Sequence, residues 1–182
     1  TMPDAVHPPI EIVQRDGLRW TAAHVKPRAE KVTARYCAQH DVACYLPLRR
    51  RAQRYQRRTV ETFLPMFPGY LFVQLDEERK SVLLCSHKVV SVLAVTAGGE
   101  ATLVQELRAV QCLEQAACHG QLTVQPEIVP GRLVRVVSGP FKGMMGVVEK
   151  RNKQTRVSVN VDILGQSVSV DLDVEELDVE PE

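Results

Sequence analysis

The feature that most constrains this chain is a change of hydrophobic pattern near residue 126. Before it, residues 101–118 carry apolar side chains three or four positions apart, which is the spacing of an amphipathic helix. After it, valines alternate with polar residues, as at residues 157–161, a pattern typical of strands with one face on a core. Pro126, Pro130 and Gly131 lie between the two patterns. The sequence therefore predicts two domains with a linker between them.

The predicted domain bounds follow from this change. The chain has 182 residues, a length that by itself allows one large domain or two small ones. We expect a disordered N-terminal segment at residues 1–16, an α+β domain at residues 17–120, a flexible linker at residues 121–130 and a small β-barrel at residues 131–182. A barrel of this size is usually a binding module.

The first predicted domain mixes strands with two helices. Pro27 stands where a helix tolerates proline best, so a helix is expected over residues 28–40. Its expected buried stripe is Ala29, Val32, Tyr36 and Cys37, and its opposite face is basic. Strands are expected over residues 19–25, 42–48, 60–64, 70–75 and 89–95, and a second helix over residues 101–118. In the second domain, strands are expected over residues 133–137, 146–150, 156–161 and 167–172.

The formal net charge of +1 conceals an uneven distribution. Residues 1–125 hold 16 basic and 12 acidic side chains, a net +4, whereas residues 126–182 hold 7 basic and 10 acidic ones, a net −3. Such an asymmetry indicates different partners for the two parts of the chain.

Six arginines lie within ten positions without an acid among them, on what we expect to be the tip of a long hairpin between residues 42–48 and 60–64. They are Arg49, Arg50, Arg51, Arg54, Arg57 and Arg58. Two interpretations are open, a solvated tip and a phosphate-binding surface. Clustered arginines repel one another and gain from a polyanion through counterion release, and the guanidinium matches phosphate geometry, so nucleic-acid binding is favoured.

Signals for catalysis are missing from the sequence. The five histidines are scattered, the five cysteines form no C-x-x-C pair, and neither a G-x-S-x-G nor a Walker A pattern occurs. No apolar stretch approaches the roughly 18 residues of a membrane span. We therefore expect a monomeric cytoplasmic binding protein that is not an enzyme, has no cofactor or metal, and has no contact with a membrane.

The segment Phe67-Pro68-Gly69 is a turn signal that introduces the strand at residues 70–75. Its apolar residues could simply enter the core. However, Phe67 and Tyr70 are three positions apart across the turn, so both are not expected to point inward. The one left outside would contribute to an exposed aromatic patch that anchors a partner.

Three segments carry a family likeness: R-W at residues 19–20, M-F-P-G-Y-L-F-V-Q-L at 66–75 and G-R-L-V-R-V-V-S-G-P-F-K-G-M-M-G-V-V-E at 131–149. Together they resemble the NusG family of transcription elongation and antitermination factors over residues 19–178, the last segment being similar to a KOW motif. K-P-R-A-E-K at residues 26–31 resembles the specialised paralogues of the RfaH type more than general NusG.

The resemblance implies an NGN-type α/β sandwich with an antiparallel sheet, followed by an SH3-like KOW barrel. It also implies that the first domain binds the clamp helices of the RNA polymerase large subunit and suppresses pausing and termination. The residues that match the polymerase-binding pocket are Trp20, Met66, Phe67, Pro68, Gly69 and Tyr70.

Two further contacts are implied by the resemblance. Besides the six arginines, the basic residues expected to approach upstream or non-template DNA are His24, Lys26, Arg28, Lys31 and Arg35. A KOW loop, here Ile163, Leu164, Gly165 and Gln166, is expected to bind a ribosomal protein or Rho. General NusG has an aromatic residue in place of Leu164 and a basic one in place of Gln166, which argues against Rho.

An alternative class of function is a ribosome- or RNA-associated KOW protein that makes no contact with polymerase. It would require strong RNA affinity from the second domain. The net charge of −3 over residues 126–182 argues against this alternative.

Overall fold

A computed structural model of the chain describes residues 9–116, 133–136, 141–151, 155–172 and 177–179. The chain divides into two compact units, Thr1–Val104 and Gln105–Glu182. The division falls inside helix α3 (Ala97–Ala116). The predicted linker at residues 121–130 lies outside the described residues, as do residues 1–8 of the predicted disordered segment. Residues 9–16 are described, and there the prediction of disorder is wrong, because Ile12 is buried and the Val13 carbonyl accepts hydrogen bonds from Trp20 and Gln74.

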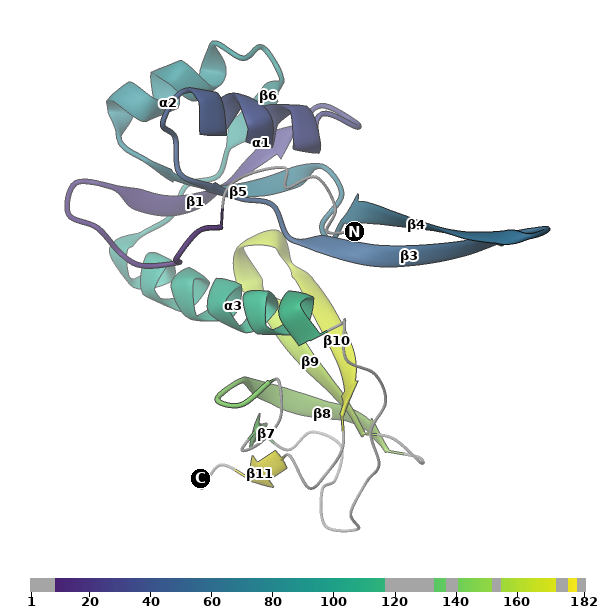
Figure 1. The fold of residues 1–182 in the computed structure, drawn as a ribbon. Helices are drawn as coiled ribbons and strands as arrows, with labels where there is room; N and C mark the ends of the chain where they lie inside the picture. The colour runs from purple at the N-terminus through teal and green to yellow at the C-terminus, as the bar shows by residue number, and fades with distance from the viewer. Residues whose placement is uncertain (1–8, 117–132, 137–140, 152–154, 173–176, 180–182) are drawn as a thin grey trace. The chain divides into compact units, whose positions relative to one another are not determined.

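The first unit is built on a four-stranded antiparallel sheet with the order β2-β5-β1-β6. The strands are β1 (Arg19–Val25), β2 (Cys44–Tyr45), β5 (Tyr70–Leu75) and β6 (Val89–Val92). The central strands β1 and β5 are buried along almost their whole length, so that even the polar Thr21 and Gln74 lie inside. Helices α1 (Glu30–Gln39) and α2 (Glu77–Leu84) lie over one face of this sheet (Figure 1).

The buried face of helix α1 agrees with the predicted stripe at Ala29 and Cys37 and differs from it elsewhere. Glu30, Thr33, Ala34 and Cys37 are buried, at the i, i+3, i+4, i+7 spacing of one helix face. Val32, expected inside, is 49% exposed, so that prediction is wrong. Relative to the prediction, the helix is turned so that Glu30 lies on its buried face. There the Glu30 carboxylate accepts a hydrogen bond from the Gly69 N–H at 2.8 Å.

Strands β3 (Leu48–Tyr55) and β4 (Arg58–Pro65) form a separate two-stranded sheet that extends away from the four-stranded one (Figure 1). The sequence predicts shorter strands with the arginines on a loop between them. In the structure the strands continue through the arginine segment, and only Gln56 and Arg57 lie between them. Neighbouring positions of a strand belong to opposite faces, which reduces the repulsion between successive arginines in an extended pairing.

Helix α2 was not predicted. Asp76 caps it, because its side chain accepts a hydrogen bond from the Arg79 backbone N–H at 2.7 Å. Glu77 and Glu78 follow in the first turn, where acidic residues favour a helix N-terminus. The sequence thus contains a recognisable N-cap for α2. It contains almost no apolar stripe there, because Leu83 is the buried residue of the helix, and so apolar periodicity did not predict it.

The second unit contains the C-terminal half of α3 and a five-stranded antiparallel sheet with the order β10-β9-β8-β7-β11. The strands are β7 (Leu133–Val136), β8 (Met145–Arg151), β9 (Thr155–Val161), β10 (Gln166–Leu172) and β11 (Leu177–Val179). The four predicted strands are confirmed to within one residue at each end, and β11 adds a fifth by pairing with β7. The chain thus has the predicted α+β domain followed by a small antiparallel β unit.

Helix α3 begins at Ala97, four residues before the predicted start. No helix in the described part of the chain is both long and apolar enough to cross a membrane.

Candidate functional site

The turn between β4 and β5 is the best-defined feature of the predicted site. The Tyr70 N–H donates a hydrogen bond to the Phe67 carbonyl oxygen at 3.1 Å, which closes the turn. Gly69 has a φ of 86°. Proline at the second position and a left-handed glycine at the third are the pattern of a type II turn. The motif that marked the site in the sequence is therefore a rigid turn that leads directly into a buried strand.

Two residues of the predicted pocket lie in the core. Phe67 is 2% exposed and packs edge-on against Phe72, with ring centroids 5.9 Å apart at 87°. Trp20 is 0% exposed and its Nε1–H donates to the Val13 carbonyl at 2.9 Å. Buried side chains of this kind support a surface without touching what binds to it.

The outer part of the turn consists of different side chains. Tyr70 stacks on His24, with ring centroids 5.0 Å apart and 23° between the planes. The two residues are opposite each other in the pairing of β1 with β5. Pro68 is exposed, and Met66 and Tyr70 are half-buried. A side chain predicted to approach DNA, His24, therefore stacks on one predicted to bind polymerase.

Glu30 holds this turn in place, a role that the sequence did not reveal. It is buried, and its Oε1 accepts the Gly69 N–H at 2.8 Å. A Cβ at Gly69 would come within 3.7 Å of the His24 ring. The His24–Tyr70 pair is thus held on a turn that is tied to the first residue of α1. The only sequence signal was an acidic residue at a predicted helix N-terminus.

The basic residues around α1 separate into two groups. Lys26, Arg28 and Arg35 are exposed, and Arg28 has the left-handed φ of 63°. Lys31 is partly buried, and its Nζ donates to the Phe63 carbonyl of β4 at 2.6 Å. The ammonium group of Lys31 therefore connects α1 to the hairpin, while the other three present charge to solvent.

The hairpin separates the arginine cluster by face. In the register of β3 with β4, Arg49 is opposite Leu64, Arg51 opposite Thr62 and Tyr55 opposite Arg58. Residues directly opposite each other share a face, and successive residues alternate. Arg49, Arg51 and Arg58 therefore lie on one face together with Tyr55, whereas Arg50 and Arg54 occupy register positions of the other and Arg57 lies in the turn.

The predicted KOW loop is a short 3-10 helix, η1 (Asp162–Leu164), which ends at Gly165 with a left-handed φ of 60°. Ile163, Leu164 and Gln166 are half-buried. A hollow of about 260 Å³ beside the loop is lined by Asn160, Val161, Asp162, Gly165 and Gln166. Two of the four predicted residues therefore line it.

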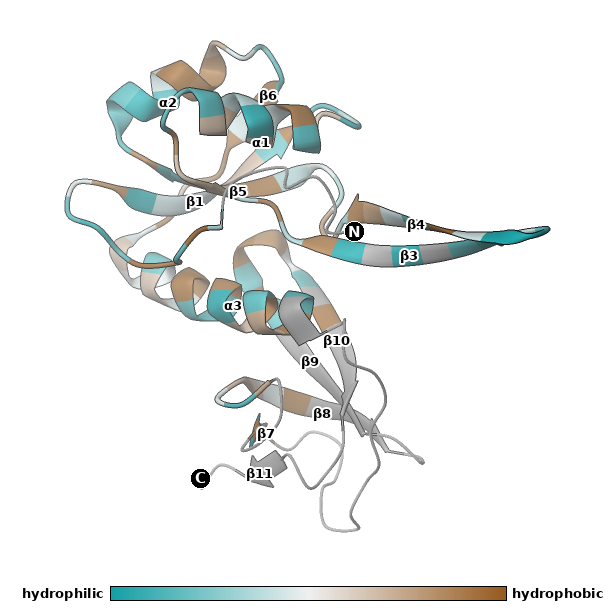
Figure 2. Cartoon of the chain, viewed as in Figure 1, coloured by the Kyte–Doolittle hydropathy of each residue, from teal (hydrophilic) through white to brown (hydrophobic). Residues whose placement is uncertain are grey.

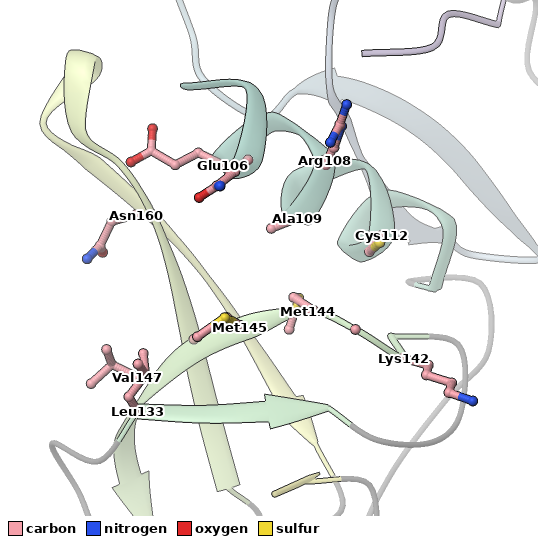
Figure 3. Close-up of a pocket in the computed structure, with 13 residues that line it drawn as sticks. Glu106, Arg108, Ala109, Cys112, Leu133, Lys142, Met144, Met145, Val147 and Asn160 are labelled. Carbon is pink, nitrogen blue, oxygen red and sulfur yellow. The ribbon is translucent and has the colours of Figure 1, made fainter. Parts of the chain in front are cut away.

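A larger pocket of about 520 Å³ lies within the second unit (Figure 3). Glu106, Ala109 and Cys112 of α3 line one side, and Met144 and Met145 lie across from them. Burial raises the pKa of Glu106 to about 7, and it raises the pKa of the Cys112 thiol. No group of three or more potential metal ligands occurs among the residues that the structure describes.

The fold and these surfaces define a class of two-unit proteins in which an α+β unit with a basic hairpin precedes a small antiparallel β unit. Residues 18–111 match the family described as "Transcription termination factor nusG", and residues 130–160 match the "KOW motif". The chain belongs to the NusG family.

Curated relatives agree with this assignment. The chain is 33% identical over 123 residues to "Transcription termination/antitermination protein NusG" of Deinococcus radiodurans, covering 59% of this chain and 65% of that one. It is 31% identical over 116 residues to the protein of the same name from Pseudomonas aeruginosa, covering 62% and 65%. The matched region thus spans about 65% of the length of these two relatives.

A solved structure shares the fold. It is described as "Domain interaction in Thermotoga maritima NusG" and aligns with a TM-score of 0.52 at 20% identity, covering 88% of this chain and 96% of that chain.

Proposed function

We propose that this chain is a transcription termination/antitermination factor that acts by binding RNA polymerase and not by catalysis. The observation that carries the proposal is the His24–Tyr70 pair, held on the turn whose Gly69 N–H is bound by Glu30. A partly exposed aromatic pair on a rigid turn suits a protein interface, because aromatic anchors lose little conformational entropy on binding. The proposed partner is the pair of clamp helices of the polymerase large subunit.

The proposed mechanism needs no chemical step. A factor that binds the elongation-competent state of polymerase more tightly than the paused state shifts the population toward elongation. The size of the effect equals the difference between the two binding free energies, so suppression of pausing and termination follows from differential binding alone.

The basic surfaces give this factor a second contact. Lys26, Arg28 and Arg35 are exposed near α1, and most of the hairpin arginines are exposed on β3 and β4. We assign them to the phosphates of upstream or non-template DNA. Such contacts are independent of sequence and weaken as salt rises.

The KOW loop supplies a third contact. Gly165 and Gln166 line the hollow beside η1, and we propose that a ribosomal protein binds there. Rho is the less favoured partner, because Leu164 and Gln166 provide neither an aromatic anchor nor a positive charge.

Tyr70→Ala tests the polymerase contact in a pull-down with purified cognate RNA polymerase. Loss of an interface anchor costs about 2 kcal/mol or more, so the Kd should rise roughly 30-fold. The matched control is Tyr55→Ala, which removes an exposed aromatic residue from a different element. Phe67→Ala is a poor test, since truncating a buried phenylalanine costs about 3–5 kcal/mol of stability.

Wild-type polymerase affinity of the Tyr70→Ala, Met66→Ala double variant would refute the polymerase contact. The activity itself is measured by in vitro transcription on a pausing template, with and without Rho. The expected result is a shorter pause dwell time with the wild-type protein than with Tyr70→Ala, and equal dwell times would contradict it.

A further inference from the structure

The two faces of the β3–β4 hairpin differ in charge and in the exposure of the aromatic residue that each carries. The first face carries Arg49, Arg51, Tyr55 and Arg58, by the register that pairs Tyr55 with Arg58. Glu61, the only acid between residues 48 and 65, is opposite Ala52 and therefore lies on the second face. That face also has the register positions of Arg50, Arg54 and the half-buried Phe63. The first face thus combines three arginines and a tyrosine with no acid. We call it the Tyr55 face.

Tyr55 is the aromatic residue of this face, and its ring is exposed. Its exposure is 51%, at the end of β3 next to the turn. Arg49, Arg51 and Arg58 on the same face are also exposed. Figure 2 shows that this end of the hairpin is hydrophilic. The ring is available to a ligand from outside.

The spacing of these groups fits a polynucleotide strand. Residues two positions apart on one face of a strand are separated by about 7 Å, so Arg49 and Arg51 can each meet a different phosphate of an extended strand. Proteins that bind single strands combine a positively charged track with aromatic rings on which bases stack. In a duplex the faces of the bases are occupied by their neighbours, so stacking on Tyr55 requires an unpaired base.

We propose that the Tyr55 face binds an unpaired nucleic-acid strand, with one base stacked on the ring of Tyr55 and the phosphates on Arg49, Arg51 and Arg58. The inference rests on the proposed nucleic-acid contact and adds to it the class of nucleic acid, the face that is used and the residue that stacks.

The test measures binding of the full chain to a labelled oligodeoxythymidine, an oligouridine and a duplex of the same length, by fluorescence anisotropy. Tyr55→Ala should weaken binding of the single strands by roughly tenfold, the effect of losing one stacked base, and leave duplex binding unchanged. Tyr55→Phe keeps the ring and should bind as the wild type does. Circular dichroism of each variant verifies the fold.

The arginines provide a matched pair of variants on the two faces. Arg51→Gln on the Tyr55 face should reduce the slope of log K against log salt for single strands by about 0.7, the value for one lost phosphate contact. Arg54→Gln on the second face should reduce the single-strand slope by less than Arg51→Gln does, and an equal reduction would overturn the assignment of the strand to the Tyr55 face.

The outcomes separate this inference from the proposed function. Equal weakening of single-strand and duplex binding by Tyr55→Ala, or wild-type single-strand binding, overturns the stacking role while the nucleic-acid contact stands. A wild-type chain that binds none of the three probes overturns both, and the polymerase pull-down remains an independent measurement.

Discussion

Gly69 and Glu30 determine the geometry of the proposed polymerase contact. Gly69 adopts a φ of 86°, which L-residues with a side chain rarely reach. Its N–H points at the buried carboxylate of Glu30, 39 positions away in the chain. The first residue of α1 thereby fixes the turn from which Tyr70 projects. The motif residues and the residue that positions them are far apart in sequence.

Glu30→Ala should destabilise the protein, because the partly buried Gly69 N–H loses its acceptor. An unsatisfied buried donor costs about 1–3 kcal/mol, and we expect a decrease of that size in the free energy of unfolding, measured by urea denaturation. Glu30→Gln keeps an acceptor oxygen at the same distance and should lose less. An equal loss for both variants would contradict the role assigned to the hydrogen bond.

Among the secondary-structure elements, those with regular apolar patterns were the ones that the sequence predicted well. The strands at residues 19–25 and 70–75 have the predicted bounds, because short, mostly apolar segments next to turn-forming Gly and Pro residues leave little choice. Helix α2 and strand β11 were not predicted. Both are short, and each depends on a contact with another element, as β11 does on β7.

Asp76 allows the capping of α2 to be tested by pH. The Arg79 backbone N–H, followed by the charge of Arg79, lowers the pKa of Asp76 below its ordinary value. A depressed folded-state pKa contributes stability above the unfolded pKa, and this contribution is lost as the pH falls through the folded value. Asp76→Ala should therefore lower the melting temperature at neutral pH, by a margin that shrinks in acid.

Asp76→Asn is the matched variant, since asparagine is also a good N-cap residue but does not titrate. Its melting temperature should lie above that of Asp76→Ala at neutral pH, and its difference from Asp76→Ala should not depend on pH. Thermal unfolding followed by circular dichroism at the two pH values checks both expectations. If Asp76→Ala lowered the melting temperature relative to the wild type by the same amount at neutral and at acid pH, the charge of the carboxylate would be irrelevant to the cap.

At the scale of the whole molecule, the charge asymmetry and the change of pattern both divide the chain. Along the chain, the first compact unit ends at Val104 and the second begins at Gln105, inside α3. The hydrophobic pattern places the division at residues 121–130. We propose that the domain boundary lies at residues 121–130. Leu107 and Val110 of α3 are completely buried, and domain boundaries fall in exposed linkers, not in the interior of a helix.

Limited digestion of the full chain with proteinase K checks this boundary. Because proteases cut first where cleavage requires the least unfolding, the earliest cleavage should fall in the predicted linker, between residues 121 and 130. Mass spectrometry of the fragments identifies the site. A first cut near residue 104 would place the boundary inside α3 instead.

The sequence by itself determined most of the strands, helices α1 and α3, the two-part organisation and the family, because local apolar periodicity, turn residues and motif order are properties of neighbouring residues. Tertiary structure alone decided that Trp20 and Phe67 lie in the core while Tyr70 stacks on His24 outside it. It also decided that the arginine segment continues the two strands of the hairpin, so that Arg58 of β4 is opposite Tyr55 of β3. The physical reason is that burial and strand register are set by contacts between residues far apart in the chain, which no local pattern contains.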